Sequence, residues 1–413
     1  MSFREINVLY DNGLNVQHVG QLASSGAITV FEYDDAWMKR GLELAPFKLP
    51  VSARSHTFKP SNMASSTFGL FADSLPDGWG MLIMDRSFKK RGIEKRDITP
   101  LDQLAFLGNH AMGALCYRPP SQEDAYAIEA VSIGDMAREA FKLYEGRIED
   151  AGRLLALIGG SPGGARPKAL IGISESNDRF VSGTSRLPEG FSHWLVKFTG
   201  EKDKYDGILE FIYNKMAYNA GITVPDHILI NDDKGGRHIA TRRFDRLSGN
   251  MRRHTATVSG LLHVSHMAPT LDYEELFKLA WRLTASAPQV EEQFRRAAFN
   301  MFAVNRDDHS KNHGYVMSDE GLWELAPAYD LTYSTGPGGE HWTSYGGEGR
   351  NPGMANLLSI AAKSSISGKS ALEIIEQVKT SVAAFKQLAK EYGVPAKISA
   401  PIIRHIETML TNK

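Results

Sequence analysis

The amino-acid sequence predicts an α+β protein in which sheet-rich and helix-rich parts follow one another along the chain. Residues 1–120 consist of short alternating strands separated by turns, residues 121–245 combine a glycine-rich segment with strand-like runs, and residues 246–413 show mostly helical periodicity. We therefore expect an N-terminal β-rich subdomain with an antiparallel sheet, a middle lobe that contains a second sheet, and an all-helical C-terminal lobe. A chain of 413 residues is long enough to bury the cores of two or three such parts.

The first 120 residues contain three segments with strand character. Ile6-Asn-Val-Leu-Tyr10 alternates apolar and polar side chains and runs into Asp11-Asn-Gly13, a turn in which glycine accepts a positive φ. The same alternation continues over 16–22 and 28–33, which predicts a small antiparallel sheet. Loops are expected at 75–78 and 96–100, between segments of more helical character.

The remaining elements are predicted from runs of apolar residues and from helical spacing. Apolar runs at 169–173 and 193–198 predict strands of the middle lobe. The spacing of apolar residues between Ile208 and Ala220 predicts a helix, and Gly221 suits its C-terminal end. Further helices are predicted at 290–304, 370–392 and 398–410.

Composition excludes several broad classes of protein. Lys and Arg total 47 against 48 Asp and Glu, a net charge of −1, so no global field draws the chain to nucleic acid or membrane. The one cysteine, Cys116, lies in an apolar run and cannot form an internal disulfide, which favours a core position and a reducing compartment. No run of 18 or more apolar residues occurs, and the first residues lack an apolar leader. We expect a cytoplasmic protein that does not bind membranes.

The segment Asn305–Gly314 carries most of the chemical information. Asp307 and Asn312 stand five positions apart, and Asp330 follows in Pro327-Ala-Tyr-Asp330. A kinase active site requires one carboxylate that orients the hydroxyl nucleophile. It also requires an amide oxygen and a second carboxylate that hold Mg²⁺. The pattern predicts a two-lobed, kinase-like fold. The usual His-Arg-Asp and Asp-Phe-Gly motifs are absent, so the likeness to kinases does not extend to these motifs.

Two upstream features agree with phosphate binding, and each has a simpler alternative. The glycine-rich segment 159–168 ends in Lys168 and could cradle phosphates with its backbone N–H groups, or it could be a plain turn. It fits neither the Walker pattern nor G-x-G-x-x-G. Lys197 lies inside an apolar strand, where kinases place a phosphate-binding lysine and where many sheets place a solvent-facing one. Glu210 is either its ion-pair partner or an ordinary solvated helix carboxylate.

The acidic segment also permits a different chemistry. Asp307, Asp308, His309 and His313 are residue types that bind zinc, manganese or iron, which would suit a metal-dependent phosphoesterase. A third interpretation is a polar loop in which an aspartate caps a helix. The order of these features along the chain favours the kinase interpretation. A kinase fold requires first the glycine-rich segment, then the strand lysine, the helix glutamate, the D-x-x-x-x-N motif and the final aspartate, and this chain has them in that order.

Taken together, these residues resemble the HipA family of bacterial toxin kinases over nearly the whole chain. The Leu75-Pro-Asp-Gly-Trp-Gly80 element and the N-terminal strands are also similar to that family. The motifs that carry the resemblance are Ser161-Pro-Gly-Gly-Ala-Arg-Pro-Lys168, Leu195-Val-Lys197, Thr241-Arg-Arg-Phe-Asp-Arg246, Asp307-Asp-His-Ser-Lys-Asn312 and Pro327-Ala-Tyr-Asp330.

The resemblance implies an ATP- and Mg²⁺-dependent serine/threonine kinase with an ATP cleft between two lobes. Asp307 would be the catalytic base, Asn312 and Asp330 the magnesium ligands, and Ser161 an autophosphorylation site that silences the enzyme. The backbone from Arg242 to Phe244 would receive the adenine. The ATP-binding residues would be Gly163, Gly164, Ala165, Arg166, Lys168, Lys197, Arg242, Phe244, His309, Asn312, Tyr329 and Asp330.

The resemblance also implies partners. Family members act as the toxin of a toxin–antitoxin pair, repressed by a helix-turn-helix antitoxin through which they reach DNA indirectly, and a known target is an aminoacyl-tRNA synthetase. The Pro162-Gly-Gly stretch, Arg242 and the segment 261–275 depart from the family pattern, so the protein substrate does not carry over. Two alternatives are a small-molecule or lipid kinase on the same scaffold and a non-catalytic co-repressor bound to the antitoxin.

Overall fold

The structure, a computed structural model, describes residues 3–25, 28–59, 66–76, 78–120, 128–147, 164, 166–182 and 185–411. The chain divides into two compact units, each assembled from separate stretches of sequence. The first unit contains Met1–Lys204, Ile230–Val264 and Val316–Gly321, and the second contains Tyr205–Leu229, Ser265–Tyr315 and Leu322–Lys413. The two units differ from the predicted segments 1–120, 121–245 and 246–413, because each predicted segment is one continuous stretch of sequence and each unit combines several stretches.

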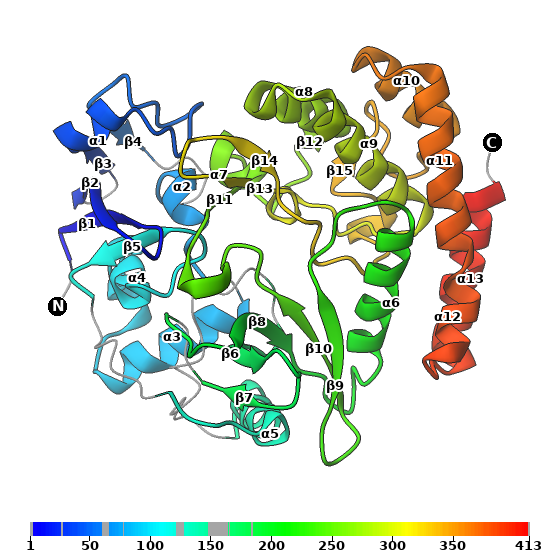
Figure 1. Cartoon of the computed structure of the whole chain (residues 1–413), viewed down its shortest axis with the longest axis horizontal. Coiled ribbons are helices and arrows are strands. Elements are labelled where there is room, and N and C mark those ends of the chain that lie inside the picture. The colour runs from blue at the N-terminus through cyan, green and yellow to red at the C-terminus, as the bar shows by residue number, and fades with distance from the viewer. Residues whose placement is uncertain are drawn as a thin grey trace. The chain divides into compact units, whose positions relative to one another are not determined.

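The first sheet of unit 1 is antiparallel, as predicted from the alternating pattern (Figure 1). Its strand order is β4-β3-β2-β1-β5. Ile6, Val8 and Tyr10 on β1 are buried while their neighbours face outward, because successive side chains of a strand point to opposite faces. The strands are β1 (Glu5–Asp11), β2 (Val16–Ser25), β3 (Ile28–Tyr33), β4 (Ser55–Phe58) and β5 (Leu115–Arg118). Cys116 on β5 is buried, as expected.

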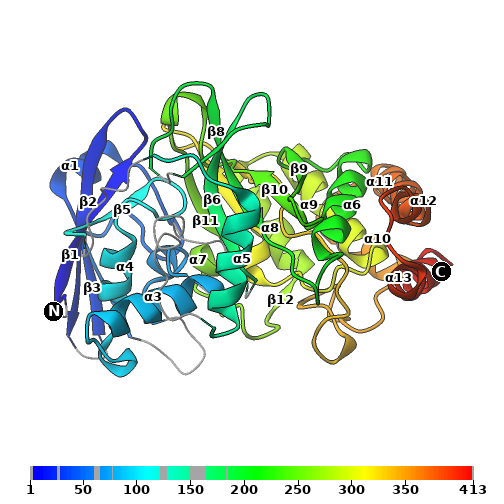
Figure 2. The same cartoon turned by 90° about the horizontal axis from the view of Figure 1, so that it is seen from below.

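Short helices complete this part of unit 1, and α4 packs against β1, β2 and β5 (Figures 1 and 2). The start of α4 is encoded locally: Thr99 caps it, Pro100 occupies its first turn, and the Asp102 carboxylate accepts from the Thr99 N–H at 2.8 Å. The helices are α1 (Asp35–Arg40), α2 (Gly69–Ala72), α3 (Gly78–Lys90), α4 (Pro100–Leu107), α5 (Ile133–Tyr144) and α7 (Val258–Leu262), with a 3₁₀ turn at Lys95–Asp97.

The second sheet has the strand order β7-β6-β8-β10-β9. All of β6 is buried, which explains why its central residues 169–173 carry no polar side chain. The expectation that Lys197 lies in mid-strand is corrected: it is the last residue of β8, where the chain leaves the sheet. Its strands are β6 (Lys168–Ser174), β7 (Phe180–Val181), β8 (Phe191–Lys197), β9 (His227–Asn231) and β10 (Arg237–Arg242). The next strand along the chain, β11 (His254–Thr257), is not part of this sheet.

A buried ionic cluster holds distant segments of unit 1 together. The Asp245 carboxylate, 1% exposed, accepts from Arg243 at 2.6 Å and from Arg246 at 2.7 Å. It also accepts from the Gly113 N–H at 2.8 Å, while Arg246 and Arg252 each donate to the Gly113 carbonyl at 2.8 Å. Burial alone would raise the pKa of Asp245, but the two guanidinium charges hold it well below its ordinary value.

Unit 2 is mainly helical, which confirms the predicted character of the C-terminal part. α11 and α12 pack against α6, and α11 and α13 pack against α9 (Figure 1). The helices are α6 (Asp206–Asn219), α8 (Tyr273–Thr284), α9 (Ala287–Phe302), α10 (Met354–Lys363), α11 (Gly368–Ala383), α12 (Phe385–Glu391) and α13 (Ala396–Thr411).

Two details of the helical prediction are corrected. The single helix predicted over 370–392 is two helices, α11 and α12, joined at Ala384. The term all-helical is too strong, because short strands occur after residue 246: β11, β12 (Leu271–Asp272), β13 (Gly314–Met317), β14 (Trp323–Leu325) and β15 (Thr343–Ser344). In the described part of the chain, no helix combines the length and the apolar character needed to span a bilayer.

Asp245→Ala is expected to destabilise unit 1 by about 3–5 kcal/mol, because it leaves two buried guanidinium groups without their carboxylate. Denaturant unfolding measured by circular dichroism reports the change. Glu32→Ala is the matched control, since Glu32 pairs with Arg54 on the surface, where both side chains are 54% exposed, and its removal should leave the unfolding midpoint nearly unchanged. Equal midpoints for both variants would show that the cluster does not hold this unit together.

Candidate functional site

The loop that carries Asp307 begins at a strained position. α9 ends at Phe302, and Val304 then takes a φ of +54°, a left-handed conformation that is unfavourable for a β-branched side chain. The next residue, Asn305, is anchored through its side-chain amide to Asn300 Oδ1 at 2.9 Å. Asn300 in turn donates to the Tyr273 hydroxyl at 2.9 Å. The loop therefore leaves the helix in a direction set by buried hydrogen bonds.

Asp307 and Asp308 are adjacent but have opposite surroundings. The side chain of Asp307 is 46% exposed, whereas that of Asp308 is 0% exposed. The Asp308 carboxylate accepts four hydrogen bonds, from the Tyr273 hydroxyl, His341 Nδ1 and the Trp342 N–H at 2.9 Å each, and from the Thr343 N–H at 3.3 Å. Burial would raise the pKa of Asp308, but His341 first, and then His313 and the Tyr273 hydroxyl, lower it.

The main chain at Asp308 is held as firmly as its side chain. Its carbonyl oxygen accepts from Thr343 Oγ1 at 2.5 Å and from His313 Nε2 at 3.2 Å. Burial lowers the pKa of His313 to about 4, so the imidazole is neutral near pH 7. It can therefore donate from Nε2 and accept at Nδ1, which lies 3.3 Å from the Gln293 amide nitrogen.

These contacts weigh against the transition-metal interpretation. Asp308 and His313 use their polar atoms on protein groups inside unit 2. Among the residues that the structure describes, no group of three or more His, Cys, Asp and Glu side chains is placed to hold a metal ion.

Asn312 and Asp330 show features that suit oxygen ligands. The Asn312 amide nitrogen donates to the Asp307 carbonyl at 2.7 Å, which leaves the amide oxygen of Asn312 as the free acceptor of that side chain. Asp330 takes a φ of +58°, a sparsely populated conformation that is often found at functional sites. Tyr329 donates to the Lys311 carbonyl at 2.6 Å and so ties the segment before Asp330 to the loop.

His309 lies between two aromatic side chains beside Asp307. Its ring centroid is 5.9 Å from that of His266 and 6.3 Å from that of Trp342, and its Nε2 is 3.9 Å from Asp307 Oδ1. Its Nδ1 is buried and has no hydrogen-bond partner among the described residues. Hydrogen bonds and ring contacts within unit 2 thus link the segment 307–312 to Tyr329, and the roles predicted for Asp307, His309, Asn312, Tyr329 and Asp330 stay predictions.

Unit 1 contains the other predicted ATP-binding residues that the structure describes. Lys168 on β6 and Lys197 on β8 are directly opposite in the antiparallel pairing, so their side chains leave the same face of the sheet. Lys168 is buried, 4% exposed, and its Nζ donates to the Gly164 carbonyl at 3.4 Å. The pairing therefore places the two lysines that the sequence assigns to phosphate binding on one face of the β6–β8 pair.

The glycine-rich segment is partly described. Gly164 and Arg166 are exposed, whereas Ser161, Gly163 and Ala165 lie outside the described residues. Trp79 anchors the described end: its N–H donates to the Gly164 carbonyl at 3.2 Å and its Nε1 donates to the Lys168 carbonyl at 2.8 Å. Sequence reasoning noted the Leu75–Gly80 element without assigning Trp79 this role.

The predicted adenine contact at Arg242 and Phe244 stays a prediction. Arg242 is the exposed last residue of β10, and Phe244 is half-buried. The N–H of Arg243 between them donates to the His193 carbonyl at 2.8 Å, so this backbone donor is already used within the protein. Glu210 is 6% exposed on α6, which excludes the interpretation as a solvated helix carboxylate.

Comparison with known families decides the relationship of this chain. Residues 160–385 match the family model described as HipA-like C-terminal domain, and residues 10–118 match HipA N-terminal domain. The chain belongs to the HipA family. It is 24% identical over 343 residues to the serine/threonine-protein kinase toxin HipA of Shewanella oneidensis, an alignment that covers 76% of this chain and 72% of that relative.

Solved structures agree on the fold. The HipA chain in the Shewanella oneidensis complex of HipA, HipB and operator DNA superimposes with a TM-score of 0.70 and 16% identity, covering 98% of this chain and 95% of that one. This likeness confirms the predicted fold class. The alignment with the Helicobacter pylori proinflammatory kinase CtkA covers 53% of this chain and 83% of the CtkA chain, at 13% identity and a TM-score of 0.37.

Asp308→Asn is expected to lower the free energy of unfolding by about 3 kcal/mol, because an amide cannot accept all four buried hydrogen bonds. The neighbouring Asp307→Asn should change it by less than about 0.5 kcal/mol, since that side chain is half exposed. Denaturant unfolding of the two variants gives the comparison. If both variants unfold like the wild type, the Asp308 network does not stabilise the loop.

Proposed function

We propose that this HipA-family chain is a serine/threonine protein kinase that transfers the γ-phosphoryl group of ATP to a hydroxyl of a protein substrate. Family membership supports the enzyme class, and the relative with the matching sequence is a serine/threonine-protein kinase toxin. The observation that carries the proposal is the pair of adjacent aspartates. Asp308 is buried and fixed by four hydrogen bonds, and this leaves the half-exposed Asp307 as the carboxylate available to a substrate.

Asp307 would accept the proton of the attacking hydroxyl and align its oxygen. Such alignment needs a carboxylate whose main chain does not move, because most of the catalysis of phosphoryl transfer is positioning and charge stabilisation. The carbonyl of Asp307 is held by Asn312, and the next residue is held by the Asp308 network. His309, whose Nε2 faces Asp307 at 3.9 Å, would contact the nucleotide beside it.

Asn312 and Asp330 would hold Mg²⁺. Amide and carboxylate oxygens are the ligands that this hard cation prefers, and these two side chains supply one of each kind. The hydrogen bond from the Asn312 amide nitrogen fixes which side of the amide carries the free oxygen. The bound ion would neutralise phosphate charge during transfer.

Lys168 and Lys197 would bind the phosphates of ATP from unit 1. Their cross-strand position gives two positive charges on one face of the β6–β8 pair. The exposed Gly164 and Arg166 precede Lys168 and would supply a backbone N–H and a guanidinium group to the same anion. Arg242 and Phe244 would receive the adenine.

We further propose that the protein is a cytoplasmic toxin controlled by a helix-turn-helix antitoxin. The similar solved chain lies in a complex with HipB and operator DNA, which supports an antitoxin partner and contact with DNA through that complex. By resemblance to the family, the target would be a translation component such as an aminoacyl-tRNA synthetase, and Ser161 would be phosphorylated by the enzyme itself.

Asp307→Asn is expected to reduce phosphoryl transfer by about 10²–10⁴-fold, because the amide cannot accept the hydroxyl proton. The measurement is transfer of label from γ-labelled ATP with Mg²⁺, followed by mapping of the phosphorylated residue. Phosphate should appear on Ser161 in the wild type and not in Asp307→Asn. The surface variant Asp233→Asn, whose side chain is 63% exposed, controls for loss of one negative charge and should label like the wild type. Label on Ser161 in Asp307→Asn at the wild-type rate would remove Asp307 from the mechanism.

Asp330→Ala is expected to abolish the gain in ATP affinity that Mg²⁺ provides, because the metal loses its carboxylate ligand. Calorimetric titration of ATP with and without Mg²⁺ measures this gain directly. ATP binding without Mg²⁺ should stay close to the wild type, which separates loss of the metal from loss of the fold. An unchanged Mg²⁺ effect would mean that Asp330 is not a ligand.

A further inference from the structure

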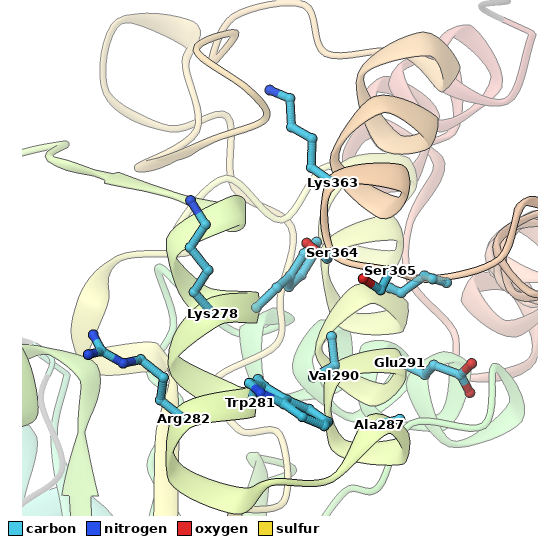
Figure 3. A pocket seen from close by; sticks show the side chains of 11 residues that line it. Lys278, Trp281, Arg282, Ala287, Val290, Glu291, Lys363, Ser364 and Ser365 are labelled. Atoms are coloured by element: carbon cyan, nitrogen blue, oxygen red, sulfur yellow. The ribbon is translucent and has the colours of Figure 1, made fainter.

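Unit 2 contains two features to which the phosphoryl-transfer proposal gives no role. The first is a pocket of about 570 Å³ among α8, the start of α9 and the end of α10 (Figure 3). Phe277 and Trp281 of α8 line this pocket, and none of the described residues proposed to bind ATP or Mg²⁺ does. The second is Arg306, which stands directly before Asp307. Arg306 belongs to the loop 304–312 itself, and its contacts extend to the segment 334–350.

The main chain around Arg306 is joined to Ser334. The Arg306 N–H donates to the Ser334 carbonyl at 3.1 Å, and the Ser334 N–H donates to the Val304 carbonyl at 3.0 Å. Asn305 and Ser334 also form an isolated parallel bridge. The loop is therefore tied to the start of the segment that follows Asp330.

The Arg306 guanidinium binds the same segment further along the chain. It donates to the Gly339 carbonyl, and its Nη2 donates to the Arg350 carbonyl at 3.2 Å. Both acceptors are uncharged main-chain oxygens. A planar guanidinium with several donors in a fixed geometry suits such a double contact. One side chain thus joins two points of the segment 334–350 to the loop.

A glycine allows the segment to come this close to Arg306. Gly336 takes a φ of +69°, and a Cβ atom there would lie 1.9 Å from the Glu340 carbonyl oxygen and 2.9 Å from Arg306 Cβ. No side chain fits in that space, so the close approach requires glycine. Gly338 also has a positive φ, +63°, but a Cβ atom there would meet no atom of the described residues within 4 Å. Of these two glycines, Gly336 is the one on which the contact with Arg306 depends.

The segment held by Arg306 also contacts the loop on the other side of Asp307. The Trp342 N–H donates to Asp308 at 2.9 Å, and the Trp342 ring centroid lies 6.3 Å from that of His309. Asp308 and His309 directly follow Asp307, and His309 Nε2 is 3.9 Å from its carboxylate. The segment 334–350 therefore contacts the residues directly before and directly after Asp307.

Protein kinases place an arginine at the same position. In the His-Arg-Asp motif it directly precedes the catalytic aspartate, and the activation segment, which follows the magnesium aspartate, becomes ordered when arginines bind a phosphorylated side chain in it. Although the full motif is absent here, Arg306 stands before Asp307, and the segment 334–350 follows Asp330. The acceptors of Arg306 are main-chain carbonyls, so these contacts do not require a phosphate group.

We propose that Arg306 is a positioning residue: it holds the segment 334–350 against the loop and so fixes Asp307 for phosphoryl transfer, without phosphorylation of that segment. This inference rests on the proposed kinase function and names what orders its site. Loss of the guanidinium would release the segment at Gly339 and Arg350. Misplacement of a reacting group by about 1 Å can cost roughly 100-fold in rate, so the effect belongs to the rate of transfer and not to ATP binding.

The test uses the full chain and follows transfer of label from γ-labelled ATP to Ser161 as a function of ATP concentration. Arg306→Met should lower the maximal rate by about 10–100-fold and leave the ATP concentration at half-maximal rate within about twofold of the wild type. Arg306→Lys should be at least about threefold faster than Arg306→Met, since an ammonium group can still donate to one carbonyl. Gly336→Ala, which keeps the arginine, should lower the maximal rate in the same way, because its methyl group forces the segment away from Arg306.

Two matched controls separate the contact from the substitutions themselves. Gly338→Ala also places alanine at a positive φ, but without a clash, and should keep the maximal rate within about threefold of the wild type. Arg54→Met removes an arginine whose side chain is 54% exposed on unit 1 and should leave the rate within about twofold.

Hydrogen–deuterium exchange without ATP gives a second measurement that does not depend on activity. Amides of the segment 334–350 should exchange about tenfold faster in Arg306→Met and Gly336→Ala than in the wild type or the two controls. Exchange in α11 should stay at the wild-type rate, which would show that unit 2 remains folded.

Three outcomes would overturn the role of Arg306. One is transfer at the wild-type rate in Arg306→Met. Another is faster exchange throughout unit 2, α11 included, which would make Arg306 a residue of general stability. The third is a phosphate mapped to the segment 334–350 of the active wild type, with loss of transfer when a phosphatase removes it. The kinase proposal fails in a different way, since the wild type and Asp307→Asn would then label equally.

Discussion

The buried carboxylate of Asp308 is the constraint on which the functional loop depends. A charged group can remain in a protein interior only if hydrogen bonds replace its water, and Asp308 obtains four, three of them from His341, Trp342 and Thr343. These donors lie more than thirty positions further along the chain, and Tyr273 lies 35 positions before it. The loop can therefore take this conformation only when both distant segments are in place, which links the position of Asp307 to the completed fold of unit 2.

Unit 1 also contains a buried carboxylate that is paired by several donors. Asp245, with Arg243, Arg246 and Arg252, ties the segment after β10 to the backbone around Gly113 near β5. The Arg-Phe-Asp-Arg motif thus joins two parts of unit 1 through Asp245 and Arg246, which lie beyond the Arg242–Phe244 backbone that the resemblance assigns to the adenine. In both units a buried carboxylate fixes segments far apart in sequence, since an incompletely paired buried charge would cost several kcal/mol.

Helix α8 contributes to two features that differ in kind. Tyr273 at its start donates into the Asp308 network, while Phe277 and Trp281 line the pocket. The Phe277 ring packs on Tyr273, with ring centroids 6.2 Å apart, so Phe277 touches a side chain that donates to Asp308.

The sequence by itself determined the features that depend on local patterns. Alternation predicted β1 to β3, and helical spacing predicted α6, α9 and α13. The spacing of Asp307, Asn312 and Asp330 predicted a magnesium-dependent kinase site, which stays a prediction. Only the tertiary structure decided which of two neighbouring aspartates faces solvent, that Lys168 and Lys197 are cross-strand partners, and that Trp79 anchors the glycine-rich segment. These outcomes depend on contacts between residues distant in sequence. Packing sets burial and hydrogen-bond partners, and it produces no periodic pattern in the sequence from which they could be predicted.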